Sequence, residues 1–150
     1  MTREVGGLDE IKRKELKKVL GTLESQRELD RLADRERAIE RNRLLYRFQE
    51  IKRSIILPTL REFMVDLDRQ GHLTRLQERS TERVRFDVQI QSREPRRGLL
   101  EISHQRADPD KVRLRWGWAK AEPVHEEASL EAIDAAFIAE RLLRLLKGAV

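Results

Sequence analysis

The sequence predicts an α+β protein, in which a long, coiled-coil-like N-terminal helical segment precedes an antiparallel meander of three or four strands and a C-terminal helix. Changes of pattern along the chain support this prediction. Residues 25–70 place apolar side chains at helical spacings among many charges, whereas residues 83–118 largely alternate apolar and polar side chains. Residues 130–147 return to a helical period.

The composition indicates one solvated domain. The chain has 150 residues, the size of an ordinary domain, and 39 % of them are charged. The 32 basic and 27 acidic side chains are interleaved, which favours a solvated helix over a disordered tail. No cysteine is present, which excludes disulfides and thiolate metal sites. Because no signal-peptide core or membrane-length apolar stretch is evident, we expect a cytoplasmic protein that does not enter a membrane.

Residues 1–24 are expected to form a short helix or flexible leader. Asp9 is a candidate N-terminal cap for the run that follows it, and Gly21 is expected to end or weaken this helix. Ile11, Leu16, Val19, Leu20 and Leu23 roughly follow one side of it.

Residues 25–70 are expected to form a long charged helix. Ser25 followed by Glu28 fits the capping box, which predicts a helix start. Pro58 cannot donate a helical hydrogen bond, so a kink or break is expected near residues 55–57. Gly71 is a suitable C-terminal cap.

A thin apolar seam on this helix predicts self-association. Its members are Leu29, Leu32, Ile39, Leu45 and Phe48. One step in the seam is of seven residues, as in a coiled coil. Such a seam buries little on a single helix, so we expect a homo-oligomer, with a dimer favoured.

Residues 71–150 are expected to form a small α+β module packed on the end of the long helix. Arg83 to Gln91, Gly98 to His104 and Lys111 to Trp118 read as strands, while His72 to Arg79 fits either a strand or a helix. Residues 119–128 read as a connector, and a helix capped by Ser129 is expected over residues 130–147. The broad apolar face between Phe48 and Leu67 predicts that residues 58–70 also pack on the sheet.

No residue constellation predicts catalysis, a metal or a cofactor. His72, His104 and His125 lack zinc-ligand spacing. The pairs Asp66 with Asp68 and Asp108 with Asp110 fit a helix surface and a turn. No nucleophile elbow or glycine-rich phosphate loop is present, so we expect a protein that is not an enzyme.

Arginines on the predicted strands form a candidate binding site for anions or nucleic acid. Its members are Arg83, Arg85, Arg113 and Arg115, with Arg96 and Arg97 nearby. The basic start of the first helix, Lys12 to Lys18, would add to it. The alternative is a solvated sheet face crossed by salt bridges, because the aromatic side chains alternate to the opposite, inward face.

The sequence therefore predicts a self-associating interaction or assembly protein, in which the long helix dimerises and the α+β module binds a partner. Nucleic-acid binding through the basic sheet face and the basic helix start is the alternative.

Overall fold

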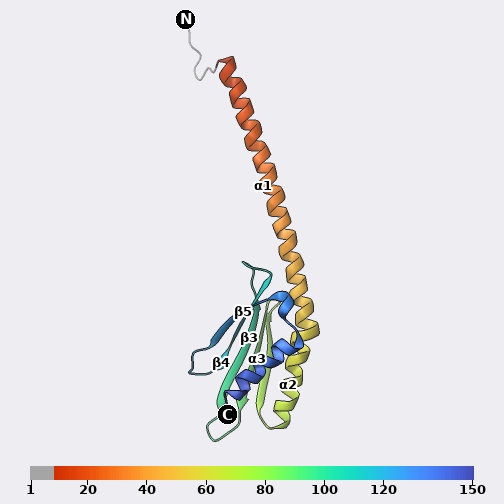
Figure 1. Ribbon diagram of the computed structural model, residues 1–150, viewed down its shortest axis with the longest axis vertical. Helices are drawn as coiled ribbons and strands as arrows, with labels where there is room; N and C mark the ends of the chain where they lie inside the picture. The colour runs from red at the N-terminus through yellow and green to blue at the C-terminus, as the bar shows by residue number, and fades with distance from the viewer. Residues whose placement is uncertain (1–8) are drawn as a thin grey trace. The chain divides into compact units, whose positions relative to one another are not determined.

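The computed structural model describes residues 9–150, so residues 1–8 of the predicted leader lie outside the described residues. Its fold is α+β, as predicted, with a long N-terminal helix, an antiparallel sheet and a C-terminal helix (Figure 1). By its contacts the chain divides into two compact units, one ending at Glu40 and one spanning Arg41–Val150. The two units are described separately.

The first helix, α1, is continuous over Glu10–Ile51. Asp9 caps it as predicted, because the backbone N–H of Lys12 donates to Asp9 Oδ1 at 2.8 Å. Gly21 and Ser25 both lie inside α1, so the predicted break and the predicted second helix start are wrong. An interior glycine costs a helix only about 1 kcal/mol, which strong helix formers on both sides offset.

The interruption expected near residues 55–57 is a π-helical turn, η1 (Lys52–Ile56), which leads into α2 (Leu57–Arg69). The backbone N–H of Leu57 donates to the carbonyl of Lys52, five residues earlier. Pro58 follows at the start of α2, where the lack of a backbone N–H costs the helix the least hydrogen bonding. The wider turn therefore accommodates a proline without ending the helical path.

The sheet has five strands rather than the predicted three or four. They run antiparallel in sequence order: β1 (Leu73–Ser80), β2 (Arg83–Ile90), β3 (Arg96–His104), β4 (Lys111–Trp118) and β5 (Val124–Ser129). The segment that fitted either strand or helix is thus strand β1. The connector after Trp118 contains β5, which the sequence analysis missed.

In strand β5, which the sequence did not predict, a charged residue in an ion pair lies on the core-facing side of the sheet, where an apolar residue is usual. Glu126 is opposite the core residue Leu114 in the register of β4 and β5. It accepts a hydrogen bond from Arg141 Nε of α3 (Ala135–Lys147) at 3.2 Å. Charged side chains on both faces concealed the alternation of this strand.

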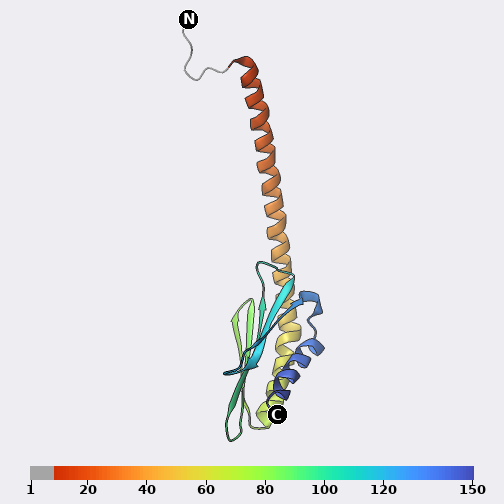
Figure 2. The ribbon, with the colours of Figure 1, turned by 60° about the vertical axis from the view of Figure 1, so that its left-hand side comes forward.

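One face of the sheet carries the core of the second unit. Helices α2 and α3 cover this face, where they contact each other as well as β1 and β4, respectively (Figure 2). The core combines residues before, within and after the sheet: Phe48, Ile51, Ile56, Leu57, Leu60, Val84, Phe86, Val88, Leu100, Ile102, Val112, Leu114, Trp116, Leu130, Ile133, Ile138, Leu142 and Leu145. The start of α2 therefore packs on the sheet, as the apolar face of residues 58–70 predicted, and helix residues from Phe48 onward join the same core.

The C-terminal helix begins later than predicted. Ser129 makes no capping hydrogen bond, and a short 3-10 turn, η2 (Leu130–Ala132), follows it. Asp134 is the cap of α3, since the N–H of Phe137 donates to Asp134 Oδ1 at 2.7 Å. Gly148 ends the helix, as expected.

Strands β1 and β5 are the two edges of the sheet. A register shift between Glu78 and Ser80 interrupts the pairing of β1 with β2. The outer edge of β5 is short and contains Glu126 and Glu127.

Candidate interaction surfaces

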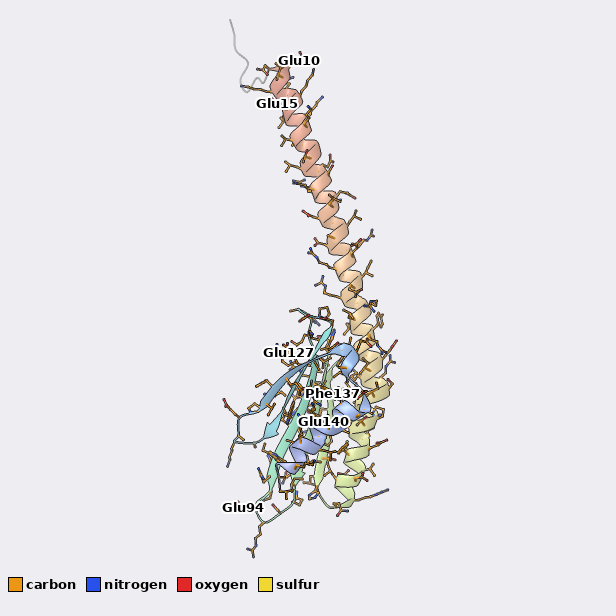
Figure 3. The ribbon with its side chains drawn as sticks, in the orientation of Figure 1. Glu10, Glu15, Glu94, Glu127, Phe137 and Glu140 are labelled. Carbon is orange, nitrogen blue, oxygen red and sulfur yellow. The ribbon has the colours of Figure 1, made fainter. Side chains whose placement is uncertain are left out.

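The part of α1 within the first unit exposes its large apolar side chains to solvent. Between 45 % and 70 % of the surface of each is accessible: Ile11, Leu16, Val19, Leu20, Leu23, Leu29, Leu32 and Ile39. Figure 3 labels Glu10 and Glu15 at the start of this helix, where side chains extend outward all around the ribbon. No hydrophobic core is formed by these residues, although their side chains are the kind that cores contain.

Seven of these eight exposed apolar residues fall into two stripes, and Ile11 belongs to neither. We call Leu16, Val19, Leu20 and Leu23 the N-stripe and Leu29, Leu32 and Ile39 the C-stripe. The N-stripe has the i, i+3, i+4, i+7 spacing of one helix face, while the C-stripe combines steps of three and seven residues. The sequence predicted the C-stripe residues as a self-association site. The N-stripe lies in the segment that the sequence predicts to be a short helix or leader, because Gly21 suggests a helix end there. The spacing of the N-stripe residues is a signal that could have identified this face.

Two other predicted self-association residues differ from these. Leu45 is only half exposed. Phe48 is fully buried and its ring stacks on that of His104, with centroids 5.1 Å apart. The inclusion of Phe48 in an exposed seam was therefore wrong, because α1 has turned from an exposed helix into a core helix by this residue.

Charge pairs along the exposed helix give it little net support. Opposite charges occur three residues apart, with Arg31 at 3.7 Å from Glu28 and Arg37 at 3.4 Å from Asp34. Residues four apart carry like charges instead: Glu24 with Glu28, Arg27 with Arg31, Asp30 with Asp34, and Arg31 with Arg35. Since i,i+3 attraction and i,i+4 repulsion are each a few tenths of a kcal/mol, they nearly cancel. Charge pairs within the exposed helix therefore contribute little to its stability.

The second surface is the sheet face opposite α2 and α3, which we call the open face. The strand register places Arg83, Ser103 and Arg113 in one row across it. The next row places Glu101 between Arg85 and Arg115. Four of the arginines predicted to share a surface therefore do share one.

Arg97 also lies on the open face, but Arg96 does not. Arg97 is opposite Gln89 in the register, whereas Arg96 is opposite Ile90. The guanidinium of Arg96 lies over the Trp118 ring, 4.9 Å from its centroid, and donates to the carbonyl of Gly148 at 3.2 Å. Placing Arg96 in the anion site was wrong, because strand β3 starts earlier than predicted and alternation directs this side chain to the helix side.

Acidic residues neutralise part of the open face. Arg85 donates to Asp87 Oδ1 at 3.0 Å, and this hydrogen bond raises the pKa of Arg85 above its ordinary value. Arg115 lies 3.7 Å from Glu101, and Arg113 lies 3.2 Å from Glu127. Arg83 and Arg97 have no ion pair with any residue in 9–150, so their charges remain available to an anion.

Two shallow hollows lie on the open face. One has a volume of about 350 Å³ and is lined in part by Arg75, Arg85 and Arg97. The other, of about 360 Å³, shares Arg85 and Arg97 and adds Arg115 and Lys120. The rings of Phe86 and Trp116 are buried in the core, and the first hollow is lined by guanidinium groups without an aromatic ring. The second hollow also includes the half-buried Trp118, whose Nε1 donates to the carbonyl of Leu145 at 3.0 Å.

Backbone groups hold two of the three histidines, His104 and His72. His104 is buried, with Nε2 2.6 Å from the carbonyl oxygen of Pro109, and its buried Nδ1 contacts no hydrogen-bonding partner there. His72 Nδ1 accepts from the backbone N–H of Gln91 at 3.1 Å. From Asp9 onward, no group of three or more histidines and carboxylates could hold a metal ion. Among the same residues, none of the helices combines the length and apolarity needed to span a membrane.

Comparison with known proteins gives no relative: no family model, no curated protein and no solved structure matches the chain.

Proposed function

We propose that this protein is a non-enzymatic assembly protein that self-associates through the exposed part of α1 and binds an acidic partner on the open face of its sheet. The observation that supports self-association is the exposure of seven large apolar side chains in the two stripes. Fully burying one such side chain is worth about 1.5–3 kcal/mol. A second helix is the usual partner for stripes of this spacing.

The contrast with the rest of the chain strengthens this proposal. Residues 41–150 bury eighteen large apolar side chains in one core, so the sequence is not generally poor at burial. Contiguous exposed apolar surface on a helix marks an interaction site more often than chance.

The non-enzymatic part is supported by the environment of the candidate acid–base groups. A hollow of about 320 Å³ is lined by His104, Glu82 and Ser103. Glu82 accepts two hydrogen bonds from Arg106, at 2.8 Å and 2.9 Å, and His104 is tied to a backbone carbonyl. These bonds hold the Glu82 carboxylate against Arg106 and His104 Nε2 against a backbone carbonyl, while His104 Nδ1 is buried without a partner among the described residues.

Sedimentation equilibrium of the full chain tests the self-association. We expect a mass above that of the monomer at micromolar concentrations. Changing Leu29, Leu32 and Ile39 to Gln should lower the association constant while leaving the helix content nearly unchanged, because Gln and Leu have similar helix propensities. A wild-type chain that stays monomeric would refute self-association.

Nucleic-acid binding is a second candidate, favoured by the unpaired Arg83 and Arg97 of the open face. Contacts would be to phosphate, because the aromatic rings of β2 and β4 alternate to the sheet face opposite these arginines. Binding of a labelled duplex or single strand should weaken steeply with added salt, and Arg83→Gln with Arg97→Gln should reduce both the affinity and the salt dependence. Exchange of the exposed, ion-paired Arg113 for Gln is the matched control. Absence of binding at low ionic strength would rule this candidate out.

A further inference from the structure

The N-stripe and the C-stripe lie on opposite sides of α1. Leu20 and Leu29 are nine residues apart, and so are Leu23 and Leu32. Nine residues make about 2.5 turns of an α-helix, so each of these pairs points in opposite directions. The helix is continuous between them, and no turn or bulge resets its phase there.

One neighbouring helix cannot cover both stripes. A helix packed along one side of α1 would reach only the apolar residues of that side and would leave the other stripe in water. Burial of both stripes therefore requires two neighbouring helices, each at a different height along α1.

The charges beside the stripes determine which stripe fits which. Glu10–Leu23 carries five basic and two acidic side chains, a net charge of +3, and contains the N-stripe. Residues 24–40 carry six acidic and four basic side chains, a net charge of −2, and contain the C-stripe. Two N-stripes facing each other would bring like charges together, whereas an N-stripe facing a C-stripe brings opposite charges together.

The basic charges also oppose the helix that carries them. Lys12 and Arg13 lie in the first turn of α1, where the helix dipole favours acidic side chains. Arg13 with Lys17, and Lys14 with Lys18, are like charges four residues apart. These positions cost the isolated helix stability, and an acidic partner segment would offset that cost.

We propose that the N-stripe of one chain docks on the C-stripe of a second copy, so that the protein assembles head to tail. This inference rests on the proposed self-association and specifies its geometry. Such an interface joins two different surface patches, and repeating it builds a ring if it closes or an open chain if it does not. Each chain then has one docking site of each kind.

A mixing experiment with two full-length variants tests the arrangement. The N-variant carries Leu20→Gln and Leu23→Gln, and the C-variant carries Leu32→Gln and Ile39→Gln. Each variant keeps only one stripe intact, because the other has lost two of its apolar side chains, so each variant should be monomeric in sedimentation velocity. Mixing them should form a one-to-one complex, because the C-variant supplies the N-stripe and the N-variant supplies the C-stripe. Ala38→Gln, an exposed change outside both stripes, should assemble like the wild type.

The possible results separate this inference from the proposed function. If either variant still dimerises alone, like stripes pair with each other and the head-to-tail arrangement is wrong, while self-association stands. If both variants are monomeric and their mixture forms no complex, the arrangement is also wrong. A monomeric wild-type chain overturns the proposed function and this inference together.

A charge exchange gives an independent test should the apolar variants lose helix content in circular dichroism. Arg13→Glu with Lys17→Glu should weaken assembly at least tenfold at low salt. Adding Glu28→Arg and Glu36→Arg to the same chain should restore assembly, because both segments have then exchanged sign. Failure of the second pair to restore assembly would contradict the pairing of N-stripe with C-stripe.

Discussion

The exposed part of α1 and the unit Arg41–Val150 place similar side chains in opposite environments. In the first, leucine, isoleucine and valine side chains are exposed to solvent, whereas in the second most side chains of these types are buried in the core beneath the sheet. The difference teaches that two kinds of stability coexist in one chain. The sheet unit is stabilised by its own core, whereas the large apolar side chains of the exposed helix are open to solvent.

Removing the helical part of the core should have the largest effect. A fragment of residues 72–150 lacks the buried residues Phe48, Ile51, Ile56, Leu57 and Leu60. At about 1.5–3 kcal/mol each, their loss approaches the entire stability of a typical domain. We expect this fragment to aggregate or to melt without cooperativity in calorimetry, whereas residues 41–150 should fold and melt cooperatively. A soluble, monomeric and cooperatively melting fragment 72–150 would show that the sheet is self-sufficient.

Equivalent truncations of one side chain in each region should have unequal costs. Phe48→Ala empties a fully buried site and should lower the free energy of unfolding in urea by about 3–5 kcal/mol. Leu32→Ala, at a position that is 47 % exposed, should change the unfolding of the sheet unit by less than about 0.5 kcal/mol and should instead weaken assembly. Comparable unfolding costs at both positions would mean that the exposed helix is part of the core.

Two glycines should respond to alanine with opposite signs. A Cβ at Gly98 would lie 3.0 Å from ring atoms of Trp118, so Gly98→Ala should cost the sheet unit about 1–3 kcal/mol as the indole shifts. A Cβ at Gly21 meets nothing within 4 Å, so Gly21→Ala should stabilise α1 by about 0.5–1 kcal/mol. Urea unfolding measures the first change and helix content by circular dichroism measures the second. A neutral Gly98→Ala would show that Trp118 can move freely.

A smaller, pH-dependent contribution should come from the ion pair of β5 with α3. The hydrogen bond from Arg141 lowers the pKa of Glu126 below the ordinary value of a glutamate. The folded state then binds this proton less readily than the unfolded state, so the stabilisation is present above the ordinary Glu pKa and is lost as the pH falls through the lowered value. When the urea midpoint of unfolding is plotted against pH, Glu126→Gln should make its fall at acidic pH less steep. Glu127→Gln, which affects the exposed pair with Arg113, should leave that fall nearly unchanged.

The sequence predicted the parts of the fold that have a clear period. The alternation of Val84, Phe86 and Val88 predicted a strand with these residues inward, and all three are buried. It failed where tertiary contacts replace local signals. Arg141 is far from Glu126 in the sequence, so nothing local marks β5 as a strand, and Asp134 caps α3 where Ser129 was an equally good local candidate.

The sequence predicted the candidate interaction surfaces about as well as it predicted the fold. Register follows from alternation, so the shared face of Arg83, Arg85, Arg113 and Arg115 could be expected. The side of Arg96 depended on the true start of β3, which lies two residues before the predicted start. The N-stripe could not be predicted as part of the long helix, because the sequence does not distinguish a glycine within a helix, such as Gly21, from a glycine that ends one.

The edges of the sheet have a consequence for how copies of this protein meet. An exposed edge strand offers unpaired backbone groups to any neighbouring strand, and native proteins discourage such pairing with bulges, short strands and charges. Here β1 is interrupted near Ser80 and carries Arg75 and Arg79, while β5 is short and acidic. Strand addition between copies is thereby disfavoured, and crowding should not convert ordered assembly into amyloid-like aggregation. Thioflavin fluorescence should stay constant in concentrated wild-type samples. It should rise when Arg75 and Arg79 are changed to Val, and this difference would demonstrate the protection.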